Sequence, residues 1–358
     1  MLSRFKTLEL TRVRTMPLLS ISCRDSFFDS LRNDYSEFDK WYNRVASQGR
    51  NAWVVDSIDM PLAALCIFKI ESEGELITDD GQTLKGEFLK ICTLKVQERG
   101  IKYGERLLYT AFHYAKKNAL SNVYIQVRKD SHRDLVKLLL RYGFIQFGRY
   151  KKDVSFVKRM LPGKAPAPDS SYMERLDYDI SFYPYYLDGP LIKKFLLSIP
   201  ESVHDNLFPD ARTQTLAFPV VGRPVVGEMN AICKSCFQVG NVPGICPSDL
   251  LFFYAKGSDC NVTCMGFVED YYLCPKGSVC PIQYIDRLPF SRTEIARMLS
   301  EQDMMLINFR LIQYLNAPIG RKTFSKSGFE VNHRSILAIP NDIYSSVIKP
   351  RLNDCGVE

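Results

Sequence analysis

Length, composition and charge limit what this chain can be. Its 358 residues exceed what one hydrophobic core usually holds, and a composition of 46% hydrophobic and 24% charged residues is typical of folded domains. No run of about 18 apolar residues is present, which argues against a membrane-spanning helix, and 11 cysteines without a signal-peptide pattern predict reduced thiols in the cytoplasm.

Charge is distributed unevenly along the chain. Residues 1–160 contain 28 Lys and Arg against 19 Asp and Glu, whereas residues 161–358 contain 19 against 21. A basic half suits a polyanionic ligand such as a nucleotide cofactor or RNA. A basic surface that only keeps the protein soluble is the alternative interpretation.

The first half of the chain mixes helix and strand patterns. Apolar residues at helical spacing predict two short helices within residues 25–49. A helix over residues 131–143 is expected to end at Gly143, because glycine readily adopts the left-handed conformation of a helix end. The other elements predicted here are strands at 51–58, 61–71, 86–96, 122–128, 144–150 and 153–160 and a helix at 105–120.

After this half the composition changes. Residues 161–171, LPGKAPAPDSS, have no periodicity and predict a linker, which we extend to residue 186. Strand patterns follow at 213–221, 230–239, 249–255, 261–273, 305–315 and 335–340, with helices at 291–301 and 341–352. The sequence therefore predicts an α+β fold with two domains, residues 1–160 and 187–358, the second a mainly-β barrel with a few helices.

One stretch in the first domain predicts an anion site. TLKVQERGIKYGERLLYTAF, from Thr93 to Phe112, runs from a strand through a glycine-bearing turn into a helix. Backbone N–H groups at such a turn, with the positive end of the helix dipole, bind phosphate. Arg99 and Lys102 would add positive charge. A purely structural strand–turn–helix unit shows the same pattern.

This stretch and the elements around it resemble the GNAT superfamily of acetyl-CoA-dependent N-acetyltransferases. The family signature is roughly V-x-x-x-x-R/Q-x-x-G-x-G/A, and this chain has Val96 followed by Arg99-Gly100-Ile101-Lys102-Tyr103-Gly104. The helix at 131–143 with its Gly-Phe turn is similar to the family's helix before the last hairpin. The resemblance covers residues 25–160 and implies a mixed sheet flanked by helices.

The resemblance also implies acetyl-CoA as the cofactor. The backbone from Leu94 to Val96 would bind the pantetheine arm. His132 stands where many relatives have an asparagine near that arm, although a helix-start histidine without this role is the alternative. The pyrophosphate would be held by the loop and the helix start, that is by Arg99, Gly100, Ile101, Lys102, Tyr103, Gly104 and Glu105.

The chain departs from the family pattern at two positions. Lys102 replaces the first loop glycine, and Leu139 stands where the family has its tyrosine acid. We therefore expect Tyr150 to protonate the departing thiolate, and Glu87 to accept the proton of the attacking amine. The alternatives for the acid are Tyr103, Tyr114, Tyr142 or water.

The second half resembles the PUA-like group, which includes ASCH and EVE domains. These are small barrels that often bind RNA or modified bases, and the similarity covers residues 187–352. RNA binding would require exposed aromatic side chains beside cations. The candidates are Phe252, Phe253 and Tyr254 with Lys234, Arg292, Arg310, Arg321, Lys322 and Arg334. A stabilising module without a ligand is the alternative.

The second half also contains a group of cysteines. Pairs at short spacing can hold zinc, yet Cys233 and Cys236 lie in a strand pattern, where positions three apart point to opposite faces. We therefore expect buried thiols and no metal site, with zinc as the alternative. The cysteines concerned are Cys233, Cys236, Cys246, Cys260, Cys264, Cys274 and Cys280.

Together the two resemblances imply an enzyme. We expect an acetyl-CoA-dependent N-acetyltransferase that acts on an amine, carried by an RNA such as aminoacyl-tRNA or by a protein, with the second domain aiding recognition. The combination also resembles bacterial acetyltransferases associated with toxin–antitoxin systems, which implies an antitoxin-like protein partner. The alternative is a catalytically degenerate fold that binds CoA, or partners, beside an RNA-reading domain.

Overall fold

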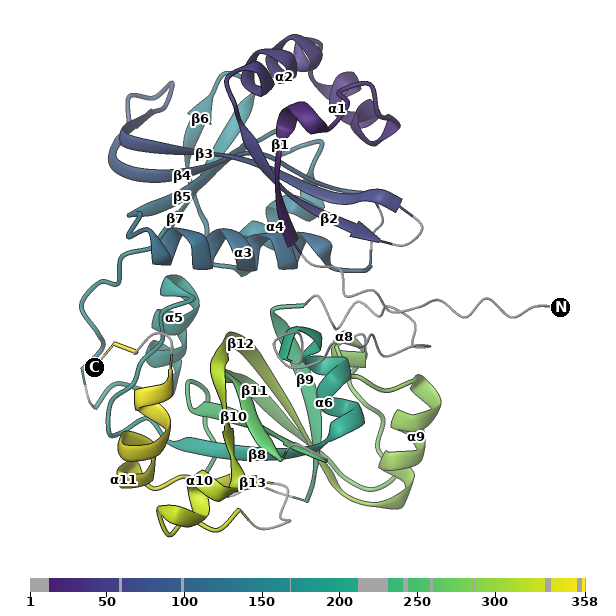
Figure 1. Cartoon of the computed structure of the whole chain (residues 1–358), viewed down its shortest axis with the longest axis vertical. Helices are drawn as coiled ribbons and strands as arrows, with labels where there is room; N and C mark the ends of the chain where they lie inside the picture. The colour runs from purple at the N-terminus through teal and green to yellow at the C-terminus, as the bar shows by residue number, and fades with distance from the viewer. Residues whose placement is uncertain are drawn as a thin grey trace, which may run out of the picture. The chain divides into compact units, whose positions relative to one another are not determined.

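The structure is a computed structural model. It describes residues 13–57, 60–97, 100–167, 169–211, 231–240, 244–257, 260–285, 287–331, 336–352 and 356–357. By their internal contacts these residues divide into two units, one ending at Leu161 and one beginning at Pro162. Each unit contains a mixed β-sheet with helices (Figure 1), so the predicted α+β class is confirmed.

The first unit is built on a seven-stranded sheet in the order β1-β2-β3-β4-β5-β7-β6. The pair β4 and β5 is parallel, and the other neighbouring pairs are antiparallel. The elements are β1 (Val13–Pro17), the 3-10 turns η1 (Leu18–Ser20) and η2 (Ser26–Phe28), α1 (Asp29–Asp34), α2 (Phe38–Ser47), β2 (Asn51–Ser57), β3 (Met60–Ile77), β4 (Thr83–Val96), α3 (Tyr103–Lys117), β5 (Asn122–Val127), α4 (Arg133–Arg141), β6 (Ile145–Tyr150) and β7 (Asp153–Arg159).

Helices cover both faces of this sheet (Figure 1). Helix α3 repeats apolar residues at three- and four-residue spacing, and Leu107, Leu108, Ala111 and Phe112 are fully buried. On the opposite face, α1 and α2 share a core with β2 and β3 that includes the buried Tyr42. Complete burial of a leucine or phenylalanine side chain contributes roughly 1.5–3 kcal/mol to the free energy of folding.

The helix and strand order predicted for residues 25–160 is confirmed. Gly143, with a φ of +80°, follows the end of α4 as expected, and Phe144 N–H donates to the carbonyl of Leu139 at 3.1 Å. Strand β1 was not predicted, because it lies at the sheet edge and shows no regular apolar alternation.

The second unit has a six-stranded sheet in the order β13-β8-β10-β11-β12-β9. The edge strands β13 and β9 do not pair with each other in the described residues. The elements are α5 (Tyr172–Phe182), β8 (Lys194–Pro200), α6 (Glu201–Leu207), η3 (Pro209–Ala211), β9 (Cys233–Val239), β10 (Leu250–Lys256), β11 (Asn261–Cys274), α8 (Ile282–Ile285), α9 (Arg292–Glu301), β12 (Met304–Gly320), α10 (Arg321–Lys326), β13 (Ile336–Ala338), α11 (Asn341–Ile343), the π-helical turn η4 (Tyr344–Ile348) and η5 (Lys349–Arg351).

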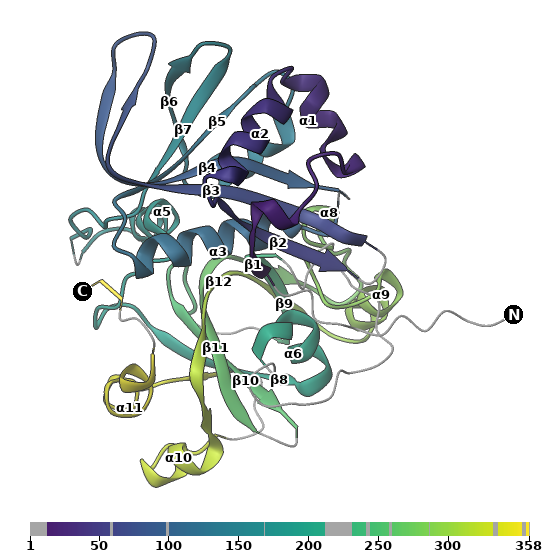
Figure 2. The same cartoon turned by 45° about the horizontal axis from the view of Figure 1, so that its top comes forward.

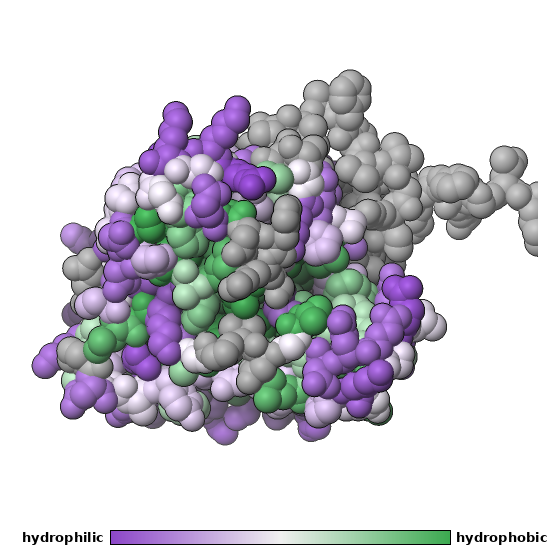
Figure 3. Space-filling view, turned by 90° about the horizontal axis from the view of Figure 1, so that it is seen from below, coloured by the Kyte–Doolittle hydropathy of each residue, from purple (hydrophilic) through white to green (hydrophobic). Residues whose placement is uncertain are grey.

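Several predictions for this half are confirmed at the level of elements. Helix α9 begins at a capping box in which Ser291 N–H donates to Glu294 at 2.8 Å. Strands β9, β10, β11 and β12 fall on predicted runs, whereas β8 was missed. The predicted strand at 213–221 lies outside the described residues. Viewed from below, the coloured side chains of this unit form hydrophobic areas with hydrophilic ones around them (Figure 3).

The expected linker over residues 161–186 requires correction. Residues 172–182 form helix α5, whose Asp179 is fully buried within the second unit. Asp179 accepts from Leu187 N–H at 2.7 Å and from the Ser248 hydroxyl. Composition does not predict the contact with Ser248, because it joins residues 69 apart in the chain.

No helix in the described part of the chain combines the length and apolar character needed to cross a bilayer.

Candidate functional site

Strands β4 and β5 pair along only part of their lengths. The parallel register covers Phe88–Ile91 and Asn122–Ile125. Immediately afterwards β4 carries an extra residue, Cys92, where its register with β3 shifts by one. Such a bulge bends a strand and increases its twist. From Cys92 to Val96, β4 has no strand partner on the β5 side among the described residues.

A cleft of about 640 Å³ opens where the two strands diverge. This volume lies within the range of roughly 300–1,000 Å³ that is usual for small-molecule sites. Its walls come from the α1–α2 segment, β3, β4, β5, the start of α4 and the start of β7. They include Tyr35, Trp41, Arg44, Arg50, Lys69, Glu71, Lys90, Cys92, Thr93, Leu94, Gln126, His132, Leu135 and Asp153.

Two of the described residues in the turn between β4 and α3 have positive φ. Gly100 has a φ of +90° and Lys102 a φ of 58°, and α3 begins at the next residue. At Gly104, an added Cβ would lie 3.3 Å from Leu138 of α4, so the helices approach closely there. The first turn of a helix presents N–H groups that the helix does not use. Arg99 lies outside the described residues.

The residues predicted to bind the cofactor differ in whether their side chains line the cleft or are buried. Leu94 lines the cleft, and Val96 lies beside the start of α3, 3.9 Å from the position of a Cβ on Gly104. Tyr103 and Glu105 are buried, and Glu105 accepts a hydrogen bond from the Tyr142 hydroxyl. The side chains of Tyr103 and Glu105 therefore belong to the interior, and these residues can offer a ligand only their backbone.

Charged side chains form the floor of the cleft on the α2 side of the sheet. The carboxylate of Glu71 accepts from the Tyr124 hydroxyl at 2.8 Å and from Lys69 Nζ at 3.0 Å. Burial opposes ionisation of Glu71, but these two hydrogen bonds and the charge of Lys90 lower its pKa. Lys90 Nζ lies 5.1 Å from the centre of the Tyr124 ring. Glu71 is therefore a carboxylate that already has a cationic partner.

The bulge residue Cys92 lies near two cations, Lys90 and Arg50. Arg50 Nη1 is 3.7 Å from the Cys92 sulfur. Burial raises the pKa of the Cys92 thiol, against the opposing charges of Lys90 and Arg50. The cysteine is therefore a thiol at neutral pH, and the two cations next to it are not neutralised by a thiolate.

A second cluster of polar side chains, which includes Arg128, Asp153 and His132, lies at the other side of the cleft. Arg128 stacks on Tyr35, with 4.4 Å between its Cζ and the ring centre, and its Nε lies 3.8 Å from Asp153. Burial raises the pKa of Asp153, against the charges of Arg128 and His132. His132 Nε2 is 3.4 Å from the carboxylate of Asp34. His132 therefore lines the cleft with a carboxylate beside its ring.

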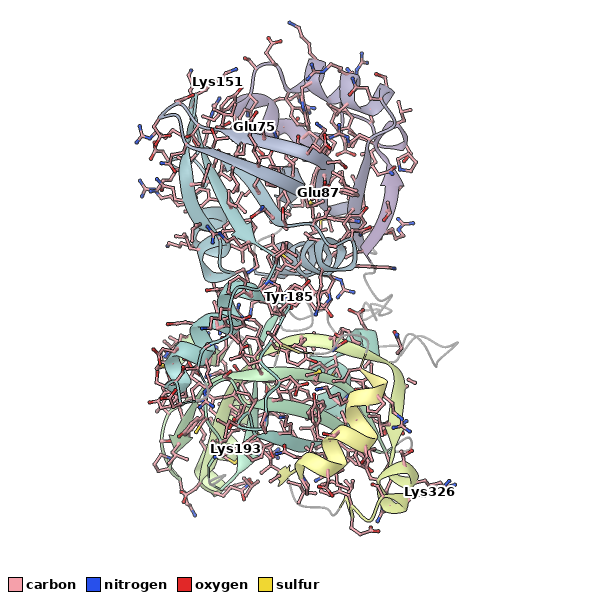
Figure 4. The ribbon with its side chains drawn as sticks, turned by 90° about the vertical axis from the view of Figure 1, so that its left-hand side faces the viewer. Glu75, Glu87, Lys151, Tyr185, Lys193 and Lys326 are labelled. Carbon is pink, nitrogen blue, oxygen red and sulfur yellow. The ribbon has the colours of Figure 1, made fainter. Side chains whose placement is uncertain are left out.

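The structure does not bring the predicted acid and base together. The carbonyl of Glu87 accepts from Ser121 N–H at 2.9 Å, at the end of the β4–β5 pair opposite the cleft. Tyr150 is exposed at the tip of the β6–β7 hairpin, next to Lys151. Figure 4 shows Glu87 well separated from Lys151. Neither Glu87 nor Tyr150 lines the cleft.

The hairpin that carries Tyr150 contacts a second hairpin. Lys151 N–H donates to Asp79 at 2.7 Å, and Asp79 N–H donates to the carbonyl of Arg149 at 2.8 Å. Figure 2 shows the β3–β4 hairpin beside the β6–β7 hairpin. Tyr150 is thus part of a hairpin contact at the edge of the unit.

The other tyrosines considered as acids are packing residues. Tyr103 and Tyr142 are buried, and Tyr114 packs on Trp53 with ring centres 5.3 Å apart. The tyrosine that reaches the charged floor of the cleft is Tyr124, through its hydrogen bond to Glu71. Sequence reasoning missed Glu71 and Tyr124, although charged residues at every second position of β3, from Lys69 to Glu75, were a signal of one solvated sheet face.

The second unit does not present the expected stacking surface. Phe252 and Phe253 are fully buried, and Tyr254 is nearly so, because both faces of β10 are covered. Phe252 packs on Tyr344 with ring centres 5.8 Å apart, and Phe253 packs on Phe208 with ring centres 4.7 Å apart. Lys234 and Arg310 are buried as well. In the described residues, no group of three or more His, Cys, Asp or Glu side chains is arranged to hold a metal ion. The candidate Arg334 lies outside the described residues.

Comparisons with known proteins give weak likenesses. No protein-family model and no curated protein match the sequence. A mutant of the ZmASCH protein from Zymomonas mobilis aligns with a TM-score of 0.32 and 10% identity, covering 44% of this chain and 94% of that one. A GNAT-family acetyltransferase from Staphylococcus aureus gives 0.30 and 10%, covering 42% and 100%.

One further structure contains a ligand. The PaiA N-acetyltransferase from Thermoplasma acidophilum in complex with coenzyme A aligns with a TM-score of 0.28 and 17% identity, covering 40% of this chain and 83% of that one. Function must therefore be inferred from the geometry of this chain's own cleft.

Proposed function

We propose that the first unit is an acetyl-CoA-dependent N-acetyltransferase. The observation that carries this proposal is the divergence of the parallel strands β4 and β5 after Ile91, next to the start of α3. On the β5 side, β4 from Cys92 to Val96 has no strand partner among the residues that the structure describes, and a cleft of about 640 Å³ lies there. The sequence of the turn between β4 and α3 resembles that of GNAT enzymes.

The residues present fit acetyl-CoA. A strand edge without a partner can hydrogen-bond an extended amide chain as a further strand would, which suits the pantetheine arm. Residues 100–104 at the start of α3 would hold the pyrophosphate through backbone N–H groups and the charge of Lys102. An added Cβ at Gly100 would meet no atom within 4 Å, so the turn has open space beside it.

The chain's own residues would position the acceptor and move its proton. When bound, acetyl-CoA supplies an activated acetyl thioester. His132, beside Asp34, lines the cleft and is our candidate to accept the proton of the amine. Glu87, the base expected from the sequence, lies away from the cleft, so we assign it no role. Much of the rate would come from positioning two reactants side by side.

The carrier of the acceptor amine is a further part of the proposal. The excess of 28 Lys and Arg over 19 Asp and Glu in residues 1–160 supports an RNA-borne amine such as that of aminoacyl-tRNA, and a protein amine is the other candidate. The second unit would aid recognition. Mass spectrometry of RNA and protein from cells expressing wild type or His132→Ala would identify the acetylated class.

Calorimetric titration tests the core of the proposal. Wild type should bind acetyl-CoA, and Lys102→Glu should weaken binding at least tenfold, because it places like charge against the pyrophosphate. Lys85→Glu is the matched control: it makes the same charge change in an exposed residue of β4 outside the cleft. No binding by wild type, or equal loss in both variants, would contradict the assignment.

Turnover separates an enzyme from a binding module. With labelled acetyl-CoA and total RNA or lysate, wild type should transfer label and His132→Ala should transfer at least 100-fold less, the usual range for a general base. CoA release at the buffer rate with every acceptor would instead indicate a catalytically degenerate unit that binds CoA.

A further inference from the structure

We propose that the group entering the cleft from the acceptor side carries an anion, a carboxylate or a phosphate, close to its amine. This inference deepens the proposed acetyl transfer and rests on it. It concerns the α2 side of the sheet, where Arg44, Arg50 and Lys90 line the cleft.

These three cations have no carboxylate within 4 Å in the described residues. Lys90 lies over the ring of Tyr124, and Arg50 contacts the uncharged sulfur of Cys92. Both side chains are half-buried. Half-buried cations attract an anion more strongly than exposed ones, because water screens them less.

The acids that line the same cleft are already engaged. Glu71 is bound to Lys69 and Tyr124, Glu37 lies 3.1 Å from Lys40, and Asp153 lies near Arg128. The carboxylates are therefore largely compensated, and the region around Cys92 keeps a positive excess. An acceptor with a second cationic group would be repelled there, whereas an anionic group would meet cations that have no carboxylate within 4 Å in the described part of the chain.

The position of the cations separates them from the proposed pyrophosphate site. Lys90 precedes the bulge residue Cys92 on β4, and Arg50 contacts the sulfur of Cys92. Both therefore lie at the near end of the segment Cys92 to Val96, which among the described residues has no strand partner on the β5 side, whereas the proposed pyrophosphate turn comes after Val96. The anion that they attract is therefore assigned to the acceptor.

The experiment follows ligand binding through Trp41. The chain has two tryptophans; Trp41 lines the cleft, and Trp53 is buried against Phe68 with ring centres 3.9 Å apart. With CoA present, which has no acetyl group to transfer, fluorescence titrations would compare glycine and aminomethylphosphonate, which carry anions, with ethanolamine and 1,3-diaminopropane, which do not. Trp41→Phe should remove the signal. We expect the anionic amines to bind at least tenfold more tightly, and the better of the two identifies carboxylate or phosphate.

Variants locate the effect. Lys90→Met and Arg50→Met should each weaken binding of the anionic amines about tenfold, and Lys85→Met, in the same strand but outside the cleft, should leave it unchanged. Equal or tighter binding of the diamine overturns the inference, as does an absence of binding by every probe at 10 mM, or unaltered binding in both cleft variants.

Parallel titrations with acetyl-CoA keep the two proposals distinguishable. If Lys90→Met or Arg50→Met weakens acetyl-CoA binding itself, the anion belongs to the cofactor and the inference fails while the proposed function stands. If anionic amines bind but acetyl-CoA does not, the anion site stands and the proposed function fails.

Discussion

Lys102 has a backbone conformation that favours glycine. Its φ of 58° and ψ of 26° are left-handed, and a non-glycine residue pays roughly 1–2 kcal/mol there. The side chain brings positive charge to the start of α3. We interpret Lys102 as a residue whose strained backbone conformation is offset by the positive charge that it would offer to the proposed pyrophosphate.

Lys102→Gly should therefore raise the free energy of unfolding of the first unit by about 0.5–1 kcal/mol and weaken acetyl-CoA binding several-fold. Thermal unfolding and calorimetry measure the two effects. Lys102→Ala is the control, since it removes the charge and keeps a Cβ in the left-handed conformation; its affinity should fall without a gain in stability. Equal stability gains in both variants would contradict the explanation.

Asp179 gives the second unit a pH dependence. Burial raises its pKa to about 7, although hydrogen bonds from Ser248 and Leu187 N–H oppose the shift. An unfolded aspartate ionises near pH 4. Between about pH 4 and pH 7 the folded state therefore binds more protons than the unfolded state, so stability falls as pH rises through this range.

The wild type should thus lose up to about 4 kcal/mol of unfolding free energy between pH 4 and pH 7 from this group. Asp179→Asn, which keeps an oxygen to accept from Leu187 N–H, should show a smaller loss. Asp249, whose pKa burial raises to about 6, contributes in the same direction and remains in both proteins. Denaturant titrations at several pH values measure the unfolding free energies of both proteins. If the two free energies changed in parallel with pH, Asp179 would have the pKa of an ordinary aspartate and the explanation would be wrong.

At the scale of elements, a β-bulge shifts the register of two strands and so changes which backbone and side-chain atoms face each other. The register between β11 and β12 shifts at Gly266, and an added Cβ there would lie 2.5 Å from the carbonyl oxygen of Arg310. Backbone atoms cannot move aside as a flexible side chain can. The strand pair therefore requires glycine at this position.

Gly266→Ala should destabilise the second unit by about 1–3 kcal/mol, as overpacking usually does. Gly189→Ala is the matched control, because a Cβ at Gly189 meets no atom within 4 Å; its effect should stay within about 0.5 kcal/mol. Chemical denaturation of both variants supplies the comparison. A tolerated alanine at Gly266 would mean that the two strands can separate locally at little cost.

At the scale of the whole molecule, the chain contains two units with separate cores. One cluster of buried side chains belongs to residues 18–67 of the first unit and another to residues 237–306 of the second. Units with their own cores can unfold separately, and each then gives its own unfolding transition.

Heating should therefore give two transitions in calorimetry. Lys102→Gly should raise the temperature of one transition and Gly266→Ala should lower that of the other, by a few degrees each for changes of about 1 kcal/mol. If each substitution shifted both transitions equally, the two units would unfold as one cooperative block.

The sequence by itself determined the order of elements over residues 25–160 and the turn between β4 and α3. Helix and strand periodicity depend on neighbours a few residues away, and these can be read directly. Only the tertiary structure decided which side chains share the cleft. Tyr124 bonds Glu71 across 53 residues, and Arg50 meets Cys92 across 42.

The expectations that the structure does not support have the same origin. Glu87 and Tyr150 were chosen for their places near strand ends, but strand pairing puts them away from the cleft. Phe252 and Phe253 were expected to stack on bases, yet other segments of the chain cover both faces of β10 and bury them. Strand order and register depend on contacts between distant segments, which local patterns do not encode.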